Sequence, residues 1–422
     1  MRRIILLFIF VIVLIGIIVY ARGYRLDITK KTVTPTGIVS INSNPNAAKI
    51  YINGKLKGVT NQNFTLPPET YTIEVKKEGY TDWKRKLNLR GEIVMSVDAM
   101  LFPNNPSLSP ATNLGIQRAI PIDDTDKTLL ISQNGDIEKD GIYLFESTKK
   151  PLSFFPPLKL IVLKKNLPTG VNLKETTVDF SPDYSHAIFT FPVTETTTSG
   201  TSVKTTPAPA IYYISLQDGT EPLLEASASK ANFLKQWDEE KKLQITKILE
   251  TFPKDIKKIA SDSFHIVSFS PDETKILYTP TISTLLPLII TPPMIGSNQT
   301  EDTRKLEKGN YYIYDKKEDK NFLVLTPTPT PTVTPQLDAN TNSTLGDDNH
   351  FLEWYSDSKH VFIKQTKEIA VIDYDGTNKR TVYSGPFEHD FFSVNNDGKL
   401  YVLTNLNPQN NQYGDLYEVG IR

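Results

Sequence analysis

The pattern of hydrophobic positions begins with one long apolar run. Seventeen uncharged residues, Ile4 to Tyr20, stand between Arg3 and Arg22. As a helix they would extend about 26 Å, the short end of the range that crosses a bilayer. The run predicts a transmembrane helix over residues 4–20, with residues 1–3 as a cytoplasmic head. A cleaved signal peptide is the alternative, but the run is long and Arg22 lies in the one small-residue site, 21–23.

A polar, threonine-rich tether is expected over residues 21–36, and alternation with period two follows it. The expected strands of this region are 38–41, 49–52, 71–75, 85–89 and 93–101. Asn53-Gly54 is a strong hairpin signal, because both residues tolerate positive φ. Several short strands in 65 or so residues predict a compact β-sandwich over residues 37–103.

The remainder of the chain contains a repeat of two apolar strands separated by an aspartate-containing turn. The copies are Val178–Phe191, Val267–Pro280, Leu352–Gln365 and Phe392–Asn405, with a weaker one at Ile120–Gln133. A tyrosine-rich or aliphatic third strand and a polar turn follow each copy. Such units of roughly 40 residues are typical of propeller blades. The fold class is therefore all-β, with a five- or six-bladed β-propeller over residues 117–422 after a linker at 104–116.

Four segments interrupt this pattern. Residues 194–210 and 326–348 are rich in threonine and proline, which predicts exposed extended loops. Residues 221–260 are expected to be a helical insertion, either a flap on the propeller edge or a partner-binding helix. Its apolar positions recur at helical spacing: Phe233, Leu234, Trp237, Ile245, Ile248, Leu249 and Phe252. Residues 281–296 are apolar but broken by prolines, and either pack under this insertion or form a contact patch.

The composition mainly excludes classes of function. Lys and Arg number 47 and Asp and Glu 48, so there is no basic field to hold nucleic acid. The absence of cysteine excludes disulfides, thiolate metal sites and a thiol nucleophile. We expect no nucleic-acid partner.

The chain carries no recognisable catalytic motif. The five histidines, His186, His265, His350, His360 and His389, form no metal-binding pair at helical spacing. Residues 136–141 resemble the start of a calcium loop, but its twelfth position is Ser147 instead of glutamate. The repeated aspartates Asp183, Asp272, Asp357 and Asp397 are best explained as turn residues that accept backbone N–H bonds. We therefore expect no catalytic, cofactor or metal residues and no enzyme activity, and the sequence identifies no binding residue.

Two stretches resemble known families. Pro45 before Ala47-Ala48, the hairpin 51–54, Gly58-x-Thr60 and Gly79-Tyr80 together resemble a PEGA domain, in a match from Gly37 to about Phe102. This resemblance implies an envelope or surface β domain. The Phe-Ser-Pro-Asp units resemble the TolB-like repeat over residues 117–419, which implies a propeller and says little about activity.

The leading hypothesis is a single-pass membrane protein whose body is extracytoplasmic. It would bind or scaffold an envelope protein or a cell-wall glycan through the propeller. One alternative is a propeller enzyme of glycosidase or lactonase type with its site at the channel mouth. A second is an envelope receptor that needs a separate signalling partner. The sequence leaves the ligand, the blade count and the oligomeric state open.

Overall fold

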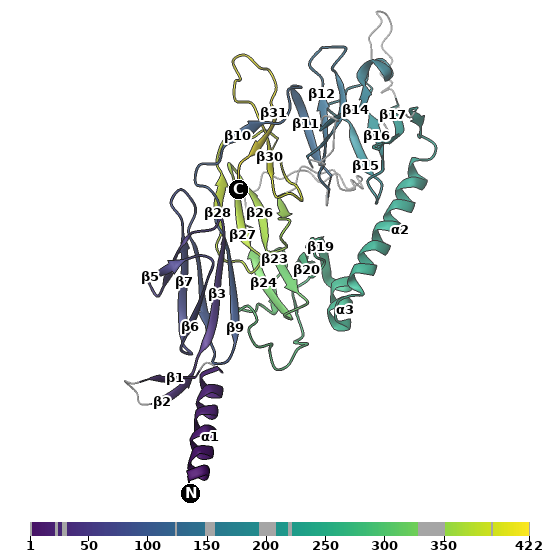
Figure 1. The fold of residues 1–422 in the computed structure, drawn as a ribbon. Coiled ribbons are helices and arrows are strands. Elements are labelled where there is room, and N and C mark those ends of the chain that lie inside the picture. The colour runs from purple at the N-terminus through teal and green to yellow at the C-terminus, as the bar shows by residue number, and fades with distance from the viewer. Residues whose placement is uncertain are drawn as a thin grey trace, which may run out of the picture. The chain divides into compact units, whose positions relative to one another are not determined.

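The computed structural model describes residues 2–21, 24–27, 32–122, 125–147, 157–193, 208–217, 222–327, 351–389 and 391–421. The fold is mostly β, as predicted, with an N-terminal helix and a helical insertion (Figure 1). Helix α1 (Arg2–Ala21) covers the initial apolar run. In the part of the chain that the structure describes, no helix has the length and apolarity needed to cross a membrane.

Two short strands follow α1 where a tether was expected. Strands β1 (Tyr24–Asp27) and β2 (Thr32–Pro35) pair antiparallel, with Tyr24 opposite Pro35. The loops expected at 194–210 and 326–348 lie largely outside the described residues.

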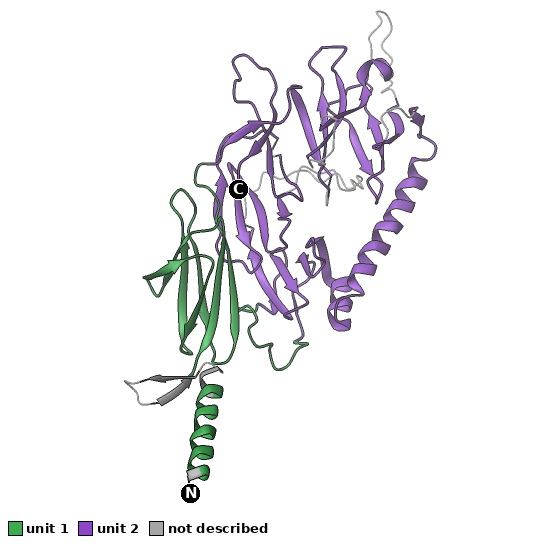
Figure 2. Cartoon of the chain, viewed as in Figure 1, with its two compact units in different colours: residues 1–105, 288–302, 422 green, residues 106–287, 303–421 purple. Residues whose placement is uncertain are grey.

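The chain divides into two compact units (Figure 2). Unit 1 contains residues 1–105, 288–302 and 422; unit 2 contains residues 106–287 and 303–421. Residues 288–302, from the apolar segment expected at 281–296, are therefore part of the N-terminal unit.

Unit 1 contains a two-sheet sandwich with seven strands. The strands are β3 (Gly37–Asn44), β4 (Lys49–Ile52), β5 (Lys55–Val59), β6 (Gln62–Leu66), β7 (Thr70–Lys76), β8 (Trp83–Asn88) and β9 (Val94–Met100). One sheet has the order β6-β3-β9, with β3 and β9 parallel; the other is antiparallel, in the order β5-β4-β7-β8. Asn53 and Gly54 have φ of 50° and 75°, so the predicted hairpin turn connects β4 and β5.

The alternating apolar residues of both sheets meet in one core. Ile41 of β3, Ile50 of β4, Ile73 of β7 and Trp83 of β8 are all fully or almost fully buried in it. This alternation fixes the register, because a slip by one residue would turn each apolar side chain to solvent. The alternation thus predicted β3, β4, β7, β8 and β9, whereas β5 and β6 were not among the expected strands.

Among its described residues, unit 2 contains five four-stranded antiparallel sheets that resemble propeller blades. Sheet 1 consists of β11 (Ile116–Pro121), β12 (Lys127–Ser132), β13 (Gly141–Glu146) and β14 (Leu158–Leu163). Sheet 2 consists of β15 (Thr177–Phe180), β16 (His186–Phe191), β17 (Ala210–Ser215) and β18 (Leu224–Glu225). Sheet 3 consists of β19 (Phe264–Phe269), β20 (Lys275–Pro280), β23 (Tyr311–Asp315) and β24 (Lys320–Leu325).

Sheet 4 consists of β25 (Leu352–Trp354), β26 (His360–Gln365), β27 (Glu368–Asp373) and β28 (Arg380–Tyr383). Sheet 5 consists of β29 (Phe392–Val394), β30 (Leu400–Thr404), β31 (Asp415–Val419) and β10 (Leu108–Pro110). Each copy of the repeat found in the sequence supplies the first two strands of one sheet.

Neighbouring sheets share apolar cores. Residues of sheets 1 and 2 form one buried cluster, those of sheets 5 and 1 a second, and those of sheets 3 and 4 a third. Between sheets 4 and 5, the buried Tyr355 hydroxyl donates a hydrogen bond to the Gly398 carbonyl at 3.3 Å. Sheets 1 and 2, sheets 5 and 1, and sheets 3 and 4 therefore pack against each other.

Sheet 5 combines strands from the two ends of unit 2. Strand β10 lies within the segment expected to be a linker, yet it pairs with β31, with Leu108 opposite Val419. The Asp415 carboxylate accepts hydrogen bonds from the Thr112 hydroxyl at 3.0 Å and from the backbone N–H groups of Leu114 at 2.7 Å and Gly115 at 3.2 Å. Residues 108–115 are therefore part of the folded unit.

The helical insertion connects sheets 2 and 3. Helix α2 (Lys230–Leu249) begins beside sheet 2, where Phe233 stacks on Tyr213 with ring centroids 5.0 Å apart. It ends beside sheet 3, where Phe252 lies 6.3 Å from the rings of Phe269 and Tyr314. Helix α3 (Lys254–Ser263) then leads into β19 (Figure 1).

The middle of α2 is exposed on all sides. Residues 242–247 are all exposed, and Leu243 retains 68% of its accessible surface. The insertion thus packs through its two ends, which differs from a flap lying along one edge.

The apolar segment after β20 has two parts. Strands β21 (Thr284–Leu285) and β22 (Lys305–Leu306) pair, and Leu285 and Pro287 line a shallow depression together with residues of α3. The part beyond Pro287 exposes Leu288, Met294 and Ile295. The first part thus contacts the insertion, and the second part presents apolar side chains to solvent.

Candidate functional site

The repeated aspartates occupy turns, as the sequence predicted. Asp183 accepts hydrogen bonds from the Ser181 hydroxyl at 2.6 Å, the Ser185 hydroxyl at 2.7 Å and the Ser185 N–H at 3.1 Å. The bond from Ser181 is the main cause that lowers the pKa of Asp183 to about 2. This carboxylate therefore holds together the turn between β15 and β16.

The same turn recurs in sheets 3 and 4. Asp272 accepts bonds from the hydroxyls of Ser270 and Thr274 at 2.7 and 2.8 Å. Burial opposes its ionisation, but these bonds and the charge of Lys275 hold the pKa of Asp272 below its usual range. Asp357 accepts the Lys359 N–H at 2.8 Å. The predicted turn role is confirmed for these three aspartates.

Buried charged pairs accompany these turns. Lys275 lies 3.7 Å from Asp315, and His360 contacts Asp357 at 2.7 Å and Asp373 at 3.4 Å. Arg380 contacts Asp373 at 3.1 Å. The charges of Lys275 and Arg380 are thus compensated by Asp315 and Asp373, and His360 lies between two carboxylates, so each of these buried side chains has a polar partner.

The calcium-like stretch folds as a hydrogen-bonded turn. Asp140 accepts the N–H groups of Asn134 at 2.5 Å and Gly135 at 3.0 Å, and Asp136 accepts that of Glu138 at 3.0 Å. Over the residues that the structure describes, no group of three or more His, Asp or Glu side chains is placed to hold a metal ion.

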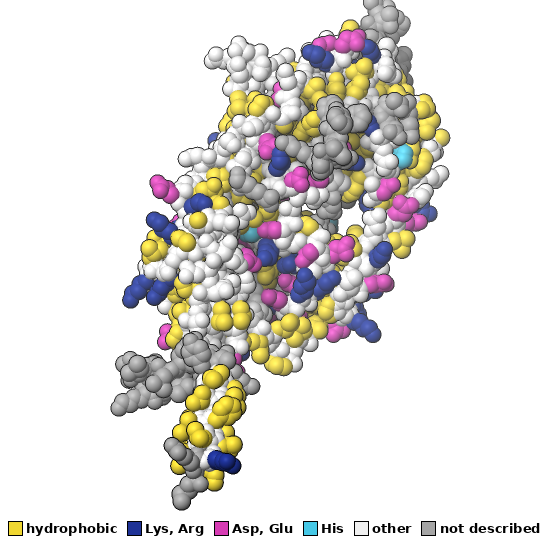
Figure 3. All heavy atoms as spheres, viewed as in Figure 1, with side chains coloured by type: hydrophobic (Ala, Val, Ile, Leu, Met, Phe, Trp, Pro, Cys, Tyr) yellow, Lys and Arg dark blue, Asp and Glu magenta, His cyan; other side chains and the backbone are white. Residues whose placement is uncertain are grey.

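One sheet of unit 1 carries an excess of basic residues. Strands β5, β4, β7 and β8, here called the basic sheet, carry seven Lys or Arg residues and one acidic residue, Glu74. The basic residues are Lys49, Lys55, Lys57, Lys76, Lys84, Arg85 and Lys86. The opposite sheet, β6-β3-β9, has no basic residue and one acidic residue, Asp98. Lysine and arginine side chains accordingly gather over the region of β5 and β7 (Figure 3).

Two carboxylates neutralise part of this charge. Glu74 lies 3.2 Å from Lys76 and 3.1 Å from Lys84, and Asp82 lies 3.1 Å from Lys76. The hydrogen bonds that Lys84 and Lys76 donate lower the pKa of Glu74, and the bond that Lys76 donates to Asp82 is the largest cause that raises the pKa of Lys76. Glu74 and Lys76 are therefore both charged at neutral pH.

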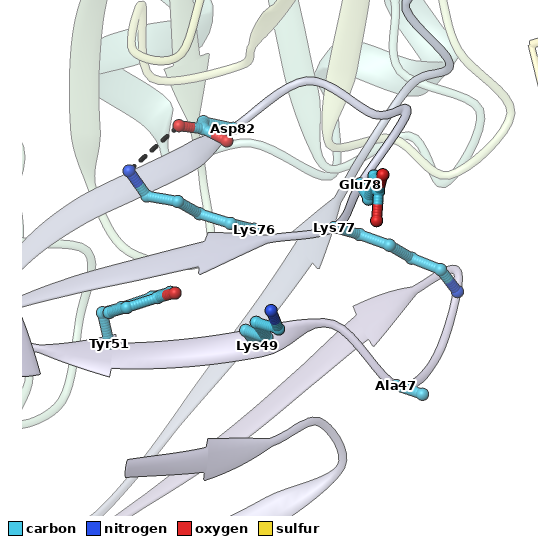
Figure 4. Close-up of a pocket in the computed structure, with 7 residues that line it drawn as sticks. All are labelled: Ala47, Lys49, Tyr51, Lys76, Lys77, Glu78 and Asp82. Atoms are coloured by element: carbon cyan, nitrogen blue, oxygen red, sulfur yellow. Dashed lines mark ion pairs between the residues drawn. The ribbon is translucent and has the colours of Figure 1, made fainter. Parts of the chain in front are cut away.

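An open depression of about 430 Å³ lies on this sheet (Figure 4). Lys49 and Tyr51 of β4 and Lys76 of β7 line it, together with Lys77, Glu78 and Asp82. The Lys76 ammonium lies 5.8 Å from the centre of the Tyr51 ring, and Lys77 donates to the Asn46 carbonyl at 2.7 Å. Three lysines and two carboxylates therefore surround the depression, with an aromatic ring beside Lys76.

A comparison with protein families identifies the sandwich of unit 1. The family model described as PEGA domain matches residues 36–105. Residues 36–105 are a PEGA domain. The resemblance drawn from the sequence for residues 37 to about 102 is thereby confirmed.

Over most of the chain, likenesses to solved structures are distant. A structure labelled TolB from Agrobacterium tumefaciens is 14% identical, with 80% of this chain and 89% of that chain covered and a TM-score of 0.15. A Trichoderma reesei carbohydrate-active enzyme of family AA12 is 10% identical, with 83% and 90% covered and a TM-score of 0.22. Kuenenia stuttgartiensis hydrazine synthase is 9% identical, with 89% and 84% covered and a TM-score of 0.16. A search of the curated proteins finds no match.

The basic sheet of the PEGA domain was missed in the sequence analysis. The overall charge of −1 concealed it, because acidic residues elsewhere balance its lysines. Assigning each residue of 49–86 to a strand would have revealed the asymmetry, since the seven basic residues lie on four strands of a single sheet.

Proposed function

We propose that this protein is a membrane-anchored binding or scaffolding protein of the cell envelope. In this proposal α1 enters the membrane, the body lies outside the cytoplasm, and the five sheets of unit 2 form a five-bladed propeller. The partner is another envelope protein or a cell-wall glycan.

Membrane insertion is supported by the exposed apolar surface of α1. Every Ile, Leu, Val and Phe from Ile4 to Ile18 is at least 41% exposed. An isolated helix that is hydrophobic all round is stable when lipid or other apolar groups cover it. The apolar run continues in the sequence through Val19 and Tyr20.

Shared cores between neighbouring sheets support the propeller, as does the pairing of β10 with β31. A ring of blades closes when the first strand of the repeat region completes the last sheet. The acidic residues of the repeat are already engaged in turns, so the exposed surfaces of the unit favour recognition over hydrolysis. Cleavage of a sugar or peptide by the purified protein would overturn this part of the proposal.

Lysine substitutions in α1 test the anchor. We expect Ile9→Lys together with Ile12→Lys to move the protein from the carbonate-resistant membrane fraction to the supernatant. Each lysine near the centre of a membrane helix costs about 2.5–3.5 kcal/mol on insertion scales. The control Leu243→Lys should remain with the membrane.

Two outcomes would contradict the anchor. One is a wild-type protein that washes off in carbonate, and the other is an intact mass showing a mature chain that begins just after Gly23.

The exposed middle of α2 is a test site for partner binding. With full-length protein in detergent as bait, we expect Leu243→Asp to reduce capture of an envelope partner several-fold. Its side chain is exposed, so the fold should be unaffected. The matched control is Ile137→Asp, in a turn of sheet 1, where 69% of the isoleucine is exposed. Equal capture by wild type and both variants would exclude α2 as the binding element.

A further inference from the structure

We infer that the basic sheet of the PEGA domain binds an extended anionic polymer of the envelope, one that carries phosphate groups at regular intervals. This inference rests on the proposed envelope location and names the ligand class for one surface of the protein. It starts from the charge asymmetry of the sandwich, seven basic residues on one sheet and none on the other.

The positions of the lysines on the sheet favour a polymer over a small anion. Lys55 is opposite the buried Ile52 and Arg85 is opposite the buried Ile73, so these two residues lie on the core side of the sheet. The lysines that share its outer face are Lys49, Lys76, Lys84 and Lys86. Neighbouring strands lie about 4.8 Å apart, so these four charges spread over roughly 10 Å across β4, β7 and β8. The depression beside Lys49 and Lys76 is open, and the basic side chains surround no enclosed cavity. A single phosphate could contact one or two of these four lysines, whereas a chain of anions can contact all of them.

Repulsion between like charges within the sheet also favours the binding of an external anion. Lys49 and Lys76 are directly opposite each other on β4 and β7. Like charges at opposed positions destabilise a sheet, and Glu74 and Asp82 offset this only for Lys76. Among the described residues, Lys49, Lys55, Lys57 and Lys86 form no ion pair, so their charges are free to attract an external anion.

The side chains are unlike those of a protein-binding surface. Lysine is depleted from protein interfaces, which instead centre on buried aromatic, methionine or arginine residues. Here the outward residues of the central strands are lysines, Glu74, threonines and the half-buried Tyr51. Leu56 and Val59, the exposed apolar residues of the basic sheet, lie on its edge strand β5. A flexible polyanion therefore fits better than a folded acidic protein.

The test measures binding of the full chain, in detergent, to inorganic polyphosphate, with neutral dextran as the uncharged control. Lys49→Gln, Lys76→Gln, Lys84→Gln and Lys86→Gln, the four lysines of the outer face, are combined in one variant. The matched control variant replaces four exposed lysines of α2 and α3 by glutamine: Lys235, Lys247, Lys254 and Lys258. Both variants remove the same charge, so they separate a local surface from the overall field of the protein.

We expect polyphosphate binding that the sheet variant weakens at least tenfold and the control variant changes less than twofold. Because the lysines are exposed, salt should screen the interaction, and binding should disappear by about 0.5 M. Equal weakening in both variants, or none in either, would overturn the inference. So would binding of poly-glutamate without polyphosphate, which would indicate an acidic protein as the partner.

These results are independent of membrane anchorage. A protein that fails the carbonate test can still bind polyphosphate through this sheet, and an anchored protein can fail to bind it. The two failures are therefore distinguishable.

Discussion

Replacing Asp415 with alanine is expected to lower the free energy of unfolding of unit 2 by about 2–4 kcal/mol. The substitution removes the acceptor of three hydrogen bonds, from the Thr112 hydroxyl and the N–H groups of Leu114 and Gly115. Each donor left unsatisfied inside a protein costs about 1–3 kcal/mol, reduced here because the site is only partly buried.

The matched variant Asp415→Asn keeps a carbonyl oxygen at the same place, so its free energy of unfolding should fall much less. Urea unfolding followed by Trp237 and Trp354, both in unit 2, measures the difference. Hydrogen exchange at Leu114 and Gly115 should accelerate only in the alanine variant. Identical midpoints for the two variants would mean that this carboxylate does not hold the start of unit 2 to its last strand.

Replacing Ile73 with alanine is expected to destabilise the PEGA domain by about 2–5 kcal/mol, the range for truncating a buried isoleucine. Ile73 is fully buried in the centre of β7. A domain of this size has a small free energy of unfolding, so a large fraction of the Ile73→Ala molecules should have this domain unfolded.

Trp83 is the reporter for this experiment, since it lies in the same core. In a background with Trp237→Phe and Trp354→Phe, its emission should shift to the red at lower urea in the Ile73→Ala variant. Thr72→Ala, on the same strand but facing outward, is the control and should move the midpoint little. If Trp83 responds equally in both variants, the sandwich is not stabilised by its alternating core.

The sandwich and the blade-like sheets could be predicted because local sequence determines them. Asn53-Gly54 defines its turn through two positive φ angles, and the period-two pattern around it sets which face is buried. The turn aspartates likewise act within two or three residues of themselves, as Asp183 does with Ser181 and Ser185.

The features that sequence reasoning missed depend on distant partners. Strand β10 has three residues beside prolines, and only its partner β31, about 300 positions later, makes it a strand. Ile245 has helical spacing but lies in the part of α2 without packing partners, so it is exposed. The basic sheet depends on the pairing of four strands. Neither propensity nor periodicity contains this information.

The pairing of β10 with β31 has a mechanical consequence. If α1 is fixed in a bilayer and a ligand pulls on unit 2, the tension passes along the backbone from Asn105 into β10. This strand is held by three residue pairs and by the Asp415 hydrogen bonds. Along the backbone from Asn105, those bonds are the first contacts of the five sheets to be loaded. The rupture force of a tethered molecule would therefore be set at residues 108–115, and a single-molecule pulling experiment would record β10 leaving sheet 5 as its first event.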